Sequence, residues 1–288
     1  MGQRDEGSLS EEAAHPRRPW LRRLRRWALL LAGTYCVLVL GISLLQRKLL
    51  YPRPAPTHEP SWAGATVLRI PCAAMGEVVA LLRPAPSPQA PMVVHFHGNA
   101  EQLADLVPLG RLLARQGLGF LAVEYPGYGL APGEPSEAAF YAAGECALAH
   151  LEGALGVERA RIVLCGQSLG SGVAVELARR GRGARLLLVS AYTSMVDMAA
   201  RTMPWLPTSW ILADRFESLG KAAQVQQPAL LLHGELDTLI PLEMSRTLAA
   251  ALPHAEVWTV AGAGHNDLWD TGGAPLLERV GAFCRGSR

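Results

Sequence analysis

The stretch that decides the fold runs from residue 161 to residue 180: RIVLC is followed by GQSLG and then by SGVAVELARR. An apolar run of strand length leads directly into a helical pattern, and Ser168 lies at the turn between them. A serine on so sharp a turn needs neighbours without bulky side chains, and Gly166 and Gly170 meet that need. The stretch therefore predicts a nucleophilic hydroxyl that points into the open. The alternative is a serine that only caps a helix.

Similar apolar runs, rich in β-branched residues, continue on both sides of this turn. Two runs, at 66–70 and 77–83, predict an opening antiparallel pair. Later runs lie at 92–96, 119–125, 161–165, 184–190, 229–233 and 256–260, and helical patterns lie at 101–116, 137–155, 169–180, 242–252 and 274–284. Strands that are apolar on both faces and alternate with helices predict a mainly parallel sheet covered on both sides. Ligands of such sheets bind at the carboxyl ends of the strands.

Two later strand ends supply the partners that a serine nucleophile requires, a base and a group that orients the base. GELD, ending at Asp237, follows the run at 229–233, and AGAGH, ending at His265, follows the run at 256–260. The order Ser168, Asp237, His265 is the one expected for this type of turn. Glu235 is the rival acid, and Asp267 is a candidate helix cap or surface residue.

Backbone N–H groups must also stabilise the developing oxyanion. We expect one from Leu169, directly after the serine, and one from Asn99, in the loop HFHGNA at 95–100. A zinc site at His95 and His97 is an alternative, because alternate strand residues share a face, but further ligands do not follow nearby. We therefore expect no metal and no cofactor, with His97 supporting the loop by hydrogen bonds. His233 is expected to support the acid turn.

Residues 27–45, WALLLAGTYCVLVLGISLL, contain no charged side chain and are long enough to cross most of a bilayer. A secretory signal is the alternative, but its small-x-small cleavage site is absent. Six arginines lie close before the run, at 17, 18, 22, 23, 25 and 26, against Arg47, Lys48 and Arg53 after it. The positive-inside rule then predicts a cytoplasmic amino terminus and a body on the outer side, which is periplasmic in a bacterium.

The chain is divided accordingly into a cytoplasmic basic tail at 1–26, a transmembrane helix at 27–45, a stiff, extended proline-rich spacer at 46–61 and a catalytic domain at 62–288. The first 16 residues are expected to be disordered. Residues 51–288 hold 18 basic and 21 acidic side chains, which argues against nucleic-acid binding. The five cysteines show no paired spacing, so we expect buried thiols rather than a disulfide framework.

A short lid is predicted around 195–220, between two of the strands. Its segment at 203–212, MPWLPTSWIL, is apolar and aromatic, and its two prolines limit it to short helical turns. One interpretation is an acyl-binding wall or a membrane-facing lip, because tryptophan favours the water-lipid boundary. The other is packing over the sheet.

The motifs HGNA at 97–100, EYPGYGLAPGEPSE at 124–137, GQSLG at 166–170, HGELDTLIP at 233–241 and GAGH at 262–265 resemble those of the α/β-hydrolase superfamily. Within it, residues 62–286 resemble the membrane-anchored branch that includes depalmitoylase-like serine hydrolases. The resemblance implies an eight-stranded, mostly parallel sheet and Ser168, Asp237 and His265 as a catalytic triad. Ala131 departs from the pattern, since relatives often have serine there. The N-terminal cysteine cluster that eukaryotic depalmitoylases use for lipid anchoring is also absent.

These observations predict a serine hydrolase that cleaves a carboxylic ester or thioester through an acyl-enzyme and is anchored in a lipid bilayer by residues 27–45. Because His265 must be neutral to accept a proton, hydrolysis should fall between about pH 8 and pH 5. Three alternatives remain open: a serine peptidase or amidase, an acyltransferase that uses the same triad, and a non-catalytic membrane-tethered binding protein.

Overall fold

The computed structural model describes residues 19–54 and 58–286 and divides the chain into two compact units, residues 1–44 and 45–288. The expected disordered tail and residues 55–57 of the expected spacer lie outside the described residues. In the first unit, the chain forms most of helix α1 (Pro19–Leu50). Within Trp20–Leu50, the most apolar stretch has a mean hydropathy of 2.3, and the helix is long enough to cross a membrane.

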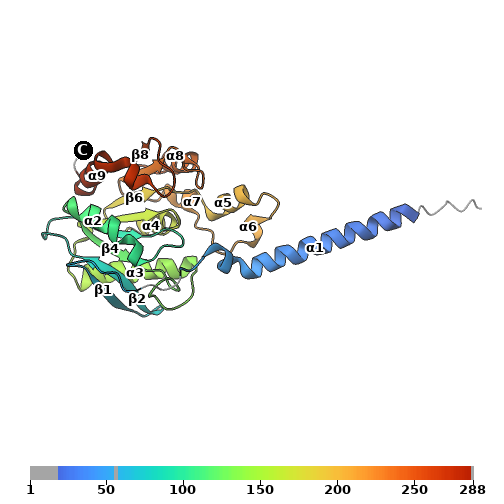
Figure 1. Cartoon of the computed structure of the whole chain (residues 1–288), viewed down its shortest axis with the longest axis horizontal. Helices are drawn as coiled ribbons and strands as arrows, with labels where there is room; N and C mark the ends of the chain where they lie inside the picture. Colours follow the sequence, from blue (N-terminus) through green and yellow to red (C-terminus); the bar gives the residue numbers. More distant parts are fainter. Residues whose placement is uncertain (1–18, 55–57, 287–288) are drawn as a thin grey trace, which may run out of the picture. The chain divides into compact units, whose positions relative to one another are not determined.

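The second unit is built on an eight-stranded sheet in the order β1-β2-β4-β3-β5-β6-β7-β8 (Figure 1). The strands are β1 (Thr66–Cys72), β2 (Gly76–Arg83), β3 (Met92–Phe96), β4 (Gly119–Val123), β5 (Ile162–Gln167), β6 (Arg185–Val189), β7 (Ala229–Gly234) and β8 (Ala255–Val260). β2 pairs antiparallel with β1 and β4, and every other pairing is parallel. The mostly parallel sheet and its opening antiparallel pair are therefore confirmed.

Helices cover both faces of this sheet, because the strands alternate buried apolar side chains between the two sides. Side chains of α3 (Glu137–Gly153), α4 (Leu169–Arg179), α7 (Ser218–Ala222) and α8 (Leu242–Ala251) contribute to one core. Side chains of α2 (Val107–Arg115) and α9 (Leu268–Arg285) contribute to the other. The short helices α5 (Met195–Thr202) and α6 (Thr208–Ile211) lie in the segment predicted to be a lid, and η1 (Leu103–Leu106) and η2 (Arg159–Arg161) are single 3₁₀ turns.

The segment after the apolar run differs from the expected extended spacer. Helix α1 continues to Leu50, and Tyr51 is 2% exposed, with its ring centroid 5.2 Å from that of Phe140. Residues 46–51 are thus part of the folded unit, because the first proline comes only at residue 52 and Tyr51 has an apolar site to fill. α9 consists of two helical segments joined across a kink at Gly273: the first begins at Leu268 and was not expected, and the second follows the kink, where a helix was expected.

A disulfide joins Cys72 to Cys146, so the expectation of buried thiols was wrong for these two residues. Cys72 ends β1 and Cys146 lies on α3, with a Cα–Cα distance of 5.8 Å and a sequence separation of 74. Spacing along the chain gives no sign of such a pair, because packing of α3 against the sheet brings the two together. Cys165 and Cys284 are buried free thiols, and Cys36 is exposed.

Candidate active site

The turn at Ser168 joins β5 to α4 at the carboxyl end of the sheet. Ser168 has φ 49° and ψ −116°, and its N–H donates to the carbonyl oxygen of Val189 at 2.8 Å. A β-carbon at Gly166 would overlap the carbonyl of Gly170, and one at Gly170 would overlap that of Phe96. The two glycines therefore permit the close approach that holds the serine in a strained conformation.

The three residues expected to form a triad lie in contact with one another. His265 Nε2 lies 3.2 Å from Ser168 Oγ, and His265 Nδ1 lies 2.7 Å from Asp237 Oδ2. An ionised carboxylate only accepts, so Nδ1 donates to Asp237, and Nε2 is left to accept the hydroxyl proton of Ser168. This arrangement is able to move a proton from the serine to the imidazole.

The carboxyl group of Asp237 is held in its ionised form. Burial opposes ionisation, but hydrogen bonds from His233, His265 and the Ile240 N–H outweigh it and hold the pKa of Asp237 well below its ordinary value. Oδ1 accepts from the N–H groups of Leu239 and Ile240 at 3.0 and 2.8 Å, which leaves Oδ2 for the imidazole. Asp237 is therefore fixed in position, and its surroundings favour the charged form.

The rival acids have other partners. Glu235 is exposed and accepts from the N–H of Gly262 at 3.1 Å. Asp267 accepts from the N–H of Gly264 at 2.7 Å and so stabilises the turn that presents His265. His233 supports the acid turn, with Nε2 2.8 Å from the carbonyl oxygen of Ile240.

The loop expected to supply an oxyanion donor lies beside the serine. A β-carbon at Gly98 would be 3.6 Å from that of Ser168. Asn99 follows Gly98, and its N–H has no hydrogen-bond acceptor in the part of the chain that the structure describes. Leu169 is the first residue of α4, where a backbone N–H has no acceptor within the helix. Both N–H groups thus remain available for a ligand near Ser168.

Three contacts that the sequence analysis did not identify fix the Asn99 loop. Tyr128 Oη donates to Asn99 Oδ1 at 2.7 Å, and Asn99 Nδ2 donates to the carbonyl oxygen of Leu50 at 2.6 Å. Glu101 Oε2 accepts from the N–H of Gly98 at 2.5 Å. The stretch EYPGYG contains Tyr128 and was the only sequence signal for this support; nothing in the sequence indicated Leu50.

The histidines of β3 and its loop have partners within the protein. His95 Nδ1 lies 3.3 Å from Cys165 Sγ, and burial, followed by the nearby His97, lowers the pKa of His95 to about 3. His97 Nδ1 donates to the carbonyl oxygen of Gly98 at 2.8 Å, and Nε2 lies 3.2 Å from Glu124 Oε1. In residues 19–54 and 58–286, no three His, Cys, Asp or Glu side chains form a metal-binding group. His97 therefore contacts the Asn99 loop as a hydrogen-bond donor.

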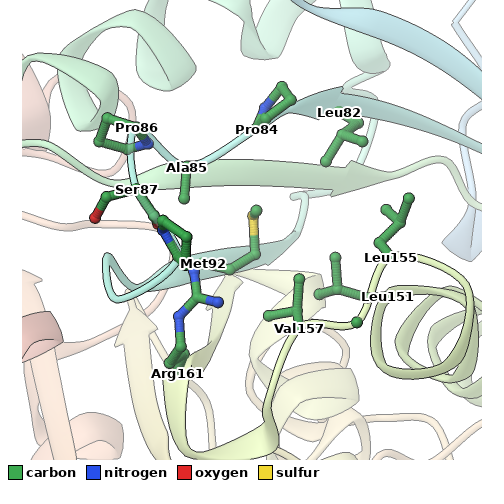
Figure 2. Close-up of a pocket in the computed structure, with 12 residues that line it drawn as sticks. Leu82, Pro84, Ala85, Pro86, Ser87, Met92, Leu151, Leu155, Val157 and Arg161 are labelled. Carbon is green, nitrogen blue, oxygen red and sulfur yellow. The ribbon is translucent and has the colours of Figure 1, made fainter.

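One cavity borders the site and another lies elsewhere. A hollow of about 190 Å³ is lined by Gln167 and Asn266, the neighbours of the serine and the histidine, together with Glu101 and Trp269. A hollow of about 430 Å³ lies between the segment that follows β2 and the segment that follows α3, and Figure 2 shows its lining. Its residues include Met92, at the start of β3, so it is at the opposite end of the strands from Ser168.

Comparison with known proteins places this chain in a family. A model described as "alpha/beta hydrolase fold" matches residues 207–271, and one described as "Serine aminopeptidase, S33" matches residues 87–220. The chain is 33% identical to the alpha/beta hydrolase domain-containing protein aho-3 of Caenorhabditis elegans, over 79% of this chain and 68% of that protein. It is 36% identical to an uncharacterized protein of Mycobacterium tuberculosis, over 67% of this chain and 69% of that one.

Solved structures show the same fold at lower identity. An esterase of Pyrococcus furiosus superposes with a TM-score of 0.65 at 17% identity, covering 82% of this chain and 99% of the esterase. A puromycin-hydrolyzing peptidase of Mycobacterium tuberculosis superposes with a TM-score of 0.65 at 19% sequence identity, covering 80% of this chain and 41% of the peptidase. The chain belongs to the α/β-hydrolase superfamily. Its relatives and structural neighbours support a hydrolase.

Proposed function

We propose that this chain is a membrane-anchored serine hydrolase that cleaves carboxylic esters or thioesters through an acyl-enzyme. The observation that carries the proposal is the unbroken hydrogen-bonded chain from Ser168 through His265 to Asp237, at 3.2 and 2.7 Å. A serine that only capped α4 would not need a histidine and a buried carboxylate from two other loops.

The proposed reaction uses the same groups in both of its half-reactions. Ser168 Oγ attacks the substrate carbonyl while its proton passes to His265 Nε2, and Asp237 stabilises the imidazolium that forms. The N–H groups of Leu169 and Asn99 hold the oxyanion. His265 then protonates the departing alcohol or thiol, and water, activated by the same imidazole, releases the acid from the serine.

The proposed location is a membrane, with residues 27–45 as the anchor, the amino terminus in the cytoplasm and the catalytic domain on the outer side. The disulfide between Cys72 and Cys146 supports this orientation independently of the charge count, because disulfides persist in oxidising compartments and are rare in the cytosol. In a bacterium the outer compartment would be the periplasm.

Fluorophosphonate labelling tests the nucleophile directly. The wild-type chain should be labelled, Ser168→Ala should lose the label, and Ser87→Ala, which changes an exposed serine at the far end of the sheet, should keep it. p-Nitrophenyl esters of graded acyl length would then measure the acyl preference. An unlabelled wild-type chain would favour a non-catalytic binding protein instead.

Amide hydrolysis is a second candidate, because one matching family model is described as a serine aminopeptidase. The same triad is able to cleave either bond. Parallel assays of aminoacyl amides and acyl esters would separate the two, and a higher kcat/KM for the amide would replace our proposal. An acyltransferase would transfer the acyl group to an added alcohol faster than to water.

A further inference from the structure

The lid exposes two large aromatic side chains. Trp210 is 89% exposed and Trp205 is 51% exposed, whereas Leu206 and Thr208, between them, are buried. Outside α1, the exposed large apolar residues of the described chain are Leu155, Trp205, Trp210, Leu219, Leu236, Leu239 and Trp258. Four of these seven, namely the two lid tryptophans and Leu236 and Leu239 of the acid turn, follow the carboxyl ends of β6 and β7. Apolar exposure is therefore concentrated at the edge of the sheet that carries Ser168.

The lid is hydrogen-bonded to the residues that directly follow the apolar run. Gln46 Nε2 donates to the carbonyl oxygen of Ile211 at 3.0 Å, and Gln46 Oε1 accepts from the N–H of Ala213 at 2.7 Å. Arg47 Nε donates to Asp214 Oδ2 at 2.9 Å. The lid is thus held by both polar atoms of one side chain and by an adjacent ion pair.

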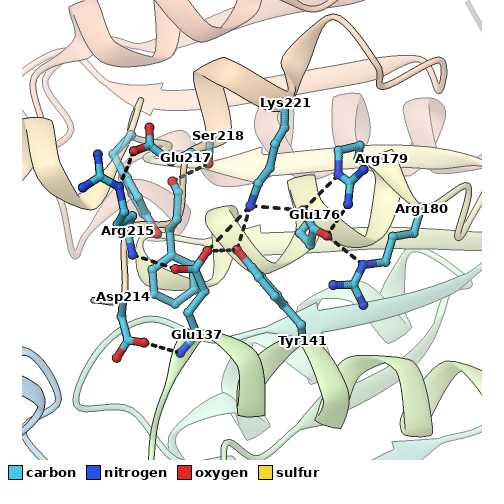
Figure 3. Close-up of polar contacts among 12 residues, drawn as sticks. Glu137, Tyr141, Glu176, Arg179, Arg180, Asp214, Arg215, Glu217, Ser218 and Lys221 are labelled. Carbon is cyan, nitrogen blue, oxygen red and sulfur yellow. Dashed lines mark hydrogen bonds and ion pairs between the residues drawn. The ribbon is translucent and has the colours of Figure 1, made fainter. Parts of the chain in front are cut away.

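The base of the lid is closed by further polar contacts. The N–H of Met195 donates to the carbonyl oxygen of Arg215 at 2.7 Å, so the two ends of the lid meet. Asp214 Oδ1 accepts from the N–H of Glu137, and Glu137 Oε2 accepts from the N–H of Arg215, as Figure 3 shows. Asp214 is buried. These contacts fix residues 211–215 of the lid beside Gln46 and Arg47, and the tip that carries Trp205 and Trp210 directly precedes them in the chain.

Chain connectivity then places this tip at a bilayer surface, provided that residues 27–45 span the membrane as proposed. Gln46 comes directly after Leu45, the last residue of the apolar run, and so lies at the water-lipid boundary. Trp210 precedes Ile211, whose carbonyl Gln46 binds. Tryptophan is enriched at that boundary, where its ring enters the headgroup region. Three acidic and three basic residues at 195–222 balance in charge, so the contact would rest on apolar side chains rather than on anionic lipid.

We infer that the lid surface formed by Trp205 and Trp210 contacts the lipid bilayer and that the acyl chain of the substrate reaches Ser168 from the bilayer. The inference rests on the proposed function and narrows its substrate class to esters or thioesters whose acyl chain resides in lipid. The lid begins beside the serine, because it starts after β6, whose last residue accepts the hydrogen bond of the Ser168 N–H.

A fluorescent label tests the contact in the full-length protein, reconstituted in phosphatidylcholine vesicles. A nitrobenzoxadiazole group is attached to Trp210→Cys or, as the matched control, to Trp258→Cys, which lies on the edge strand β8 and is 36% exposed. Both variants carry Cys36→Ser, since the other free thiols, Cys165 and Cys284, are buried. Doxyl-labelled phosphatidylcholine should quench the label at 210 several-fold more strongly than the label at 258. Equal quenching at the two positions would overturn the inference.

Activity gives the second readout. The value of kcat/KM is measured for a long-chain ester in vesicles and for a water-soluble short-chain ester, and the first is divided by the second. Replacing Trp205 and Trp210 by serine should lower this ratio on the order of tenfold, because two large apolar contacts with the bilayer are lost. Trp258→Ser should leave the ratio unchanged. An unchanged ratio in the double variant would contradict bilayer delivery of the substrate. Fluorophosphonate labelling of Ser168 in the same vesicles reports on the proposed function separately, so failure of one proposal is distinguishable from failure of the other.

Discussion

The disulfide between Cys72 and Cys146 is expected to contribute substantially to the stability of the catalytic domain. Replacing both cysteines by alanine removes a link that closes a loop with a sequence separation of 74. Loop-closure entropy for a loop of that length gives about 4 kcal/mol at 25 °C, since the unfolded chain regains its freedom. For a domain of this size, that loss corresponds to a fall in Tm of roughly 10 °C.

Thermal unfolding of the detergent-solubilised protein, followed by circular dichroism, measures this effect. Dithiothreitol should lower the Tm of the wild-type protein to that of the double variant and should not change the double variant further. Cys284→Ala is the matched control, because it also removes a buried sulfur but no cross-link. It should lose only the free energy of a small cavity and should show the full response to dithiothreitol.

Two results would refute this reasoning. One is a double variant that unfolds within about 2 °C of the wild type, because a loss of 1 kcal/mol already shifts Tm by that amount. The other is a pair of free thiols at Cys72 and Cys146 in protein alkylated inside intact cells, which would place the domain in a reducing compartment. That second result would also contradict the proposed outer location.

Four further predictions concern the site and the core. Asp237→Asn should lower kcat about 10⁴-fold in an ester assay, because the amide no longer holds His265 in the tautomer that accepts the serine proton. Asn99→Ala should lower kcat roughly 10-fold with little change in KM, since it releases the oxyanion loop from Leu50, and an effect confined to KM would contradict this. The rate of fluorophosphonate labelling should fall at acid pH, because Ser168 needs a neutral imidazole as its base, and the lowered pKa of Asp237 means that loss of this carboxylate's charge is not the cause. Glu176→Gln should lower stability by about 2 to 3 kcal/mol in urea unfolding without changing labelling, because Glu176 is buried against two arginines and Lys221.

The contribution of Glu176 to the free energy of unfolding should fall as the pH is lowered. Burial opposes ionisation of Glu176, but hydrogen bonds from Arg179, Arg180 and Lys221 lower its pKa to about 2. A depressed pKa means that the folded state favours the ionised form, so this stabilisation is complete above the unfolded-state pKa of about 4.3 and is lost as the pH falls toward 2. The difference in unfolding free energy between wild type and Glu176→Gln should therefore shrink between about pH 5 and pH 2, and a constant difference would contradict the assignment.

The sequence by itself determined the parts of this protein that depend on local pattern. Apolar runs that alternate with helical patterns predicted the sheet, and the glycines at 166 and 170 predicted the turn at Ser168. Because parallel strands present their carboxyl ends at one edge, the positions of Asp237 and His265 after two later strands also predicted that they would meet the serine.

Only the tertiary structure decided the contacts between segments that carry no mutual signal along the chain. Examples are the pairing of Cys72 with Cys146 and the hydrogen bonds of Gln46 to the lid, which join elements that become neighbours only when the helices pack on the finished sheet. The continuation of α1 to Leu50 is a further feature that the sequence pattern did not predict. A strand or a turn is specified by the residues within it, whereas such a contact is specified by the fit of two surfaces that exist only after folding. The exposure of Trp210 was decided in the same way, because whether a tryptophan packs over the sheet depends on the folded surface beside it and not on its neighbours along the chain.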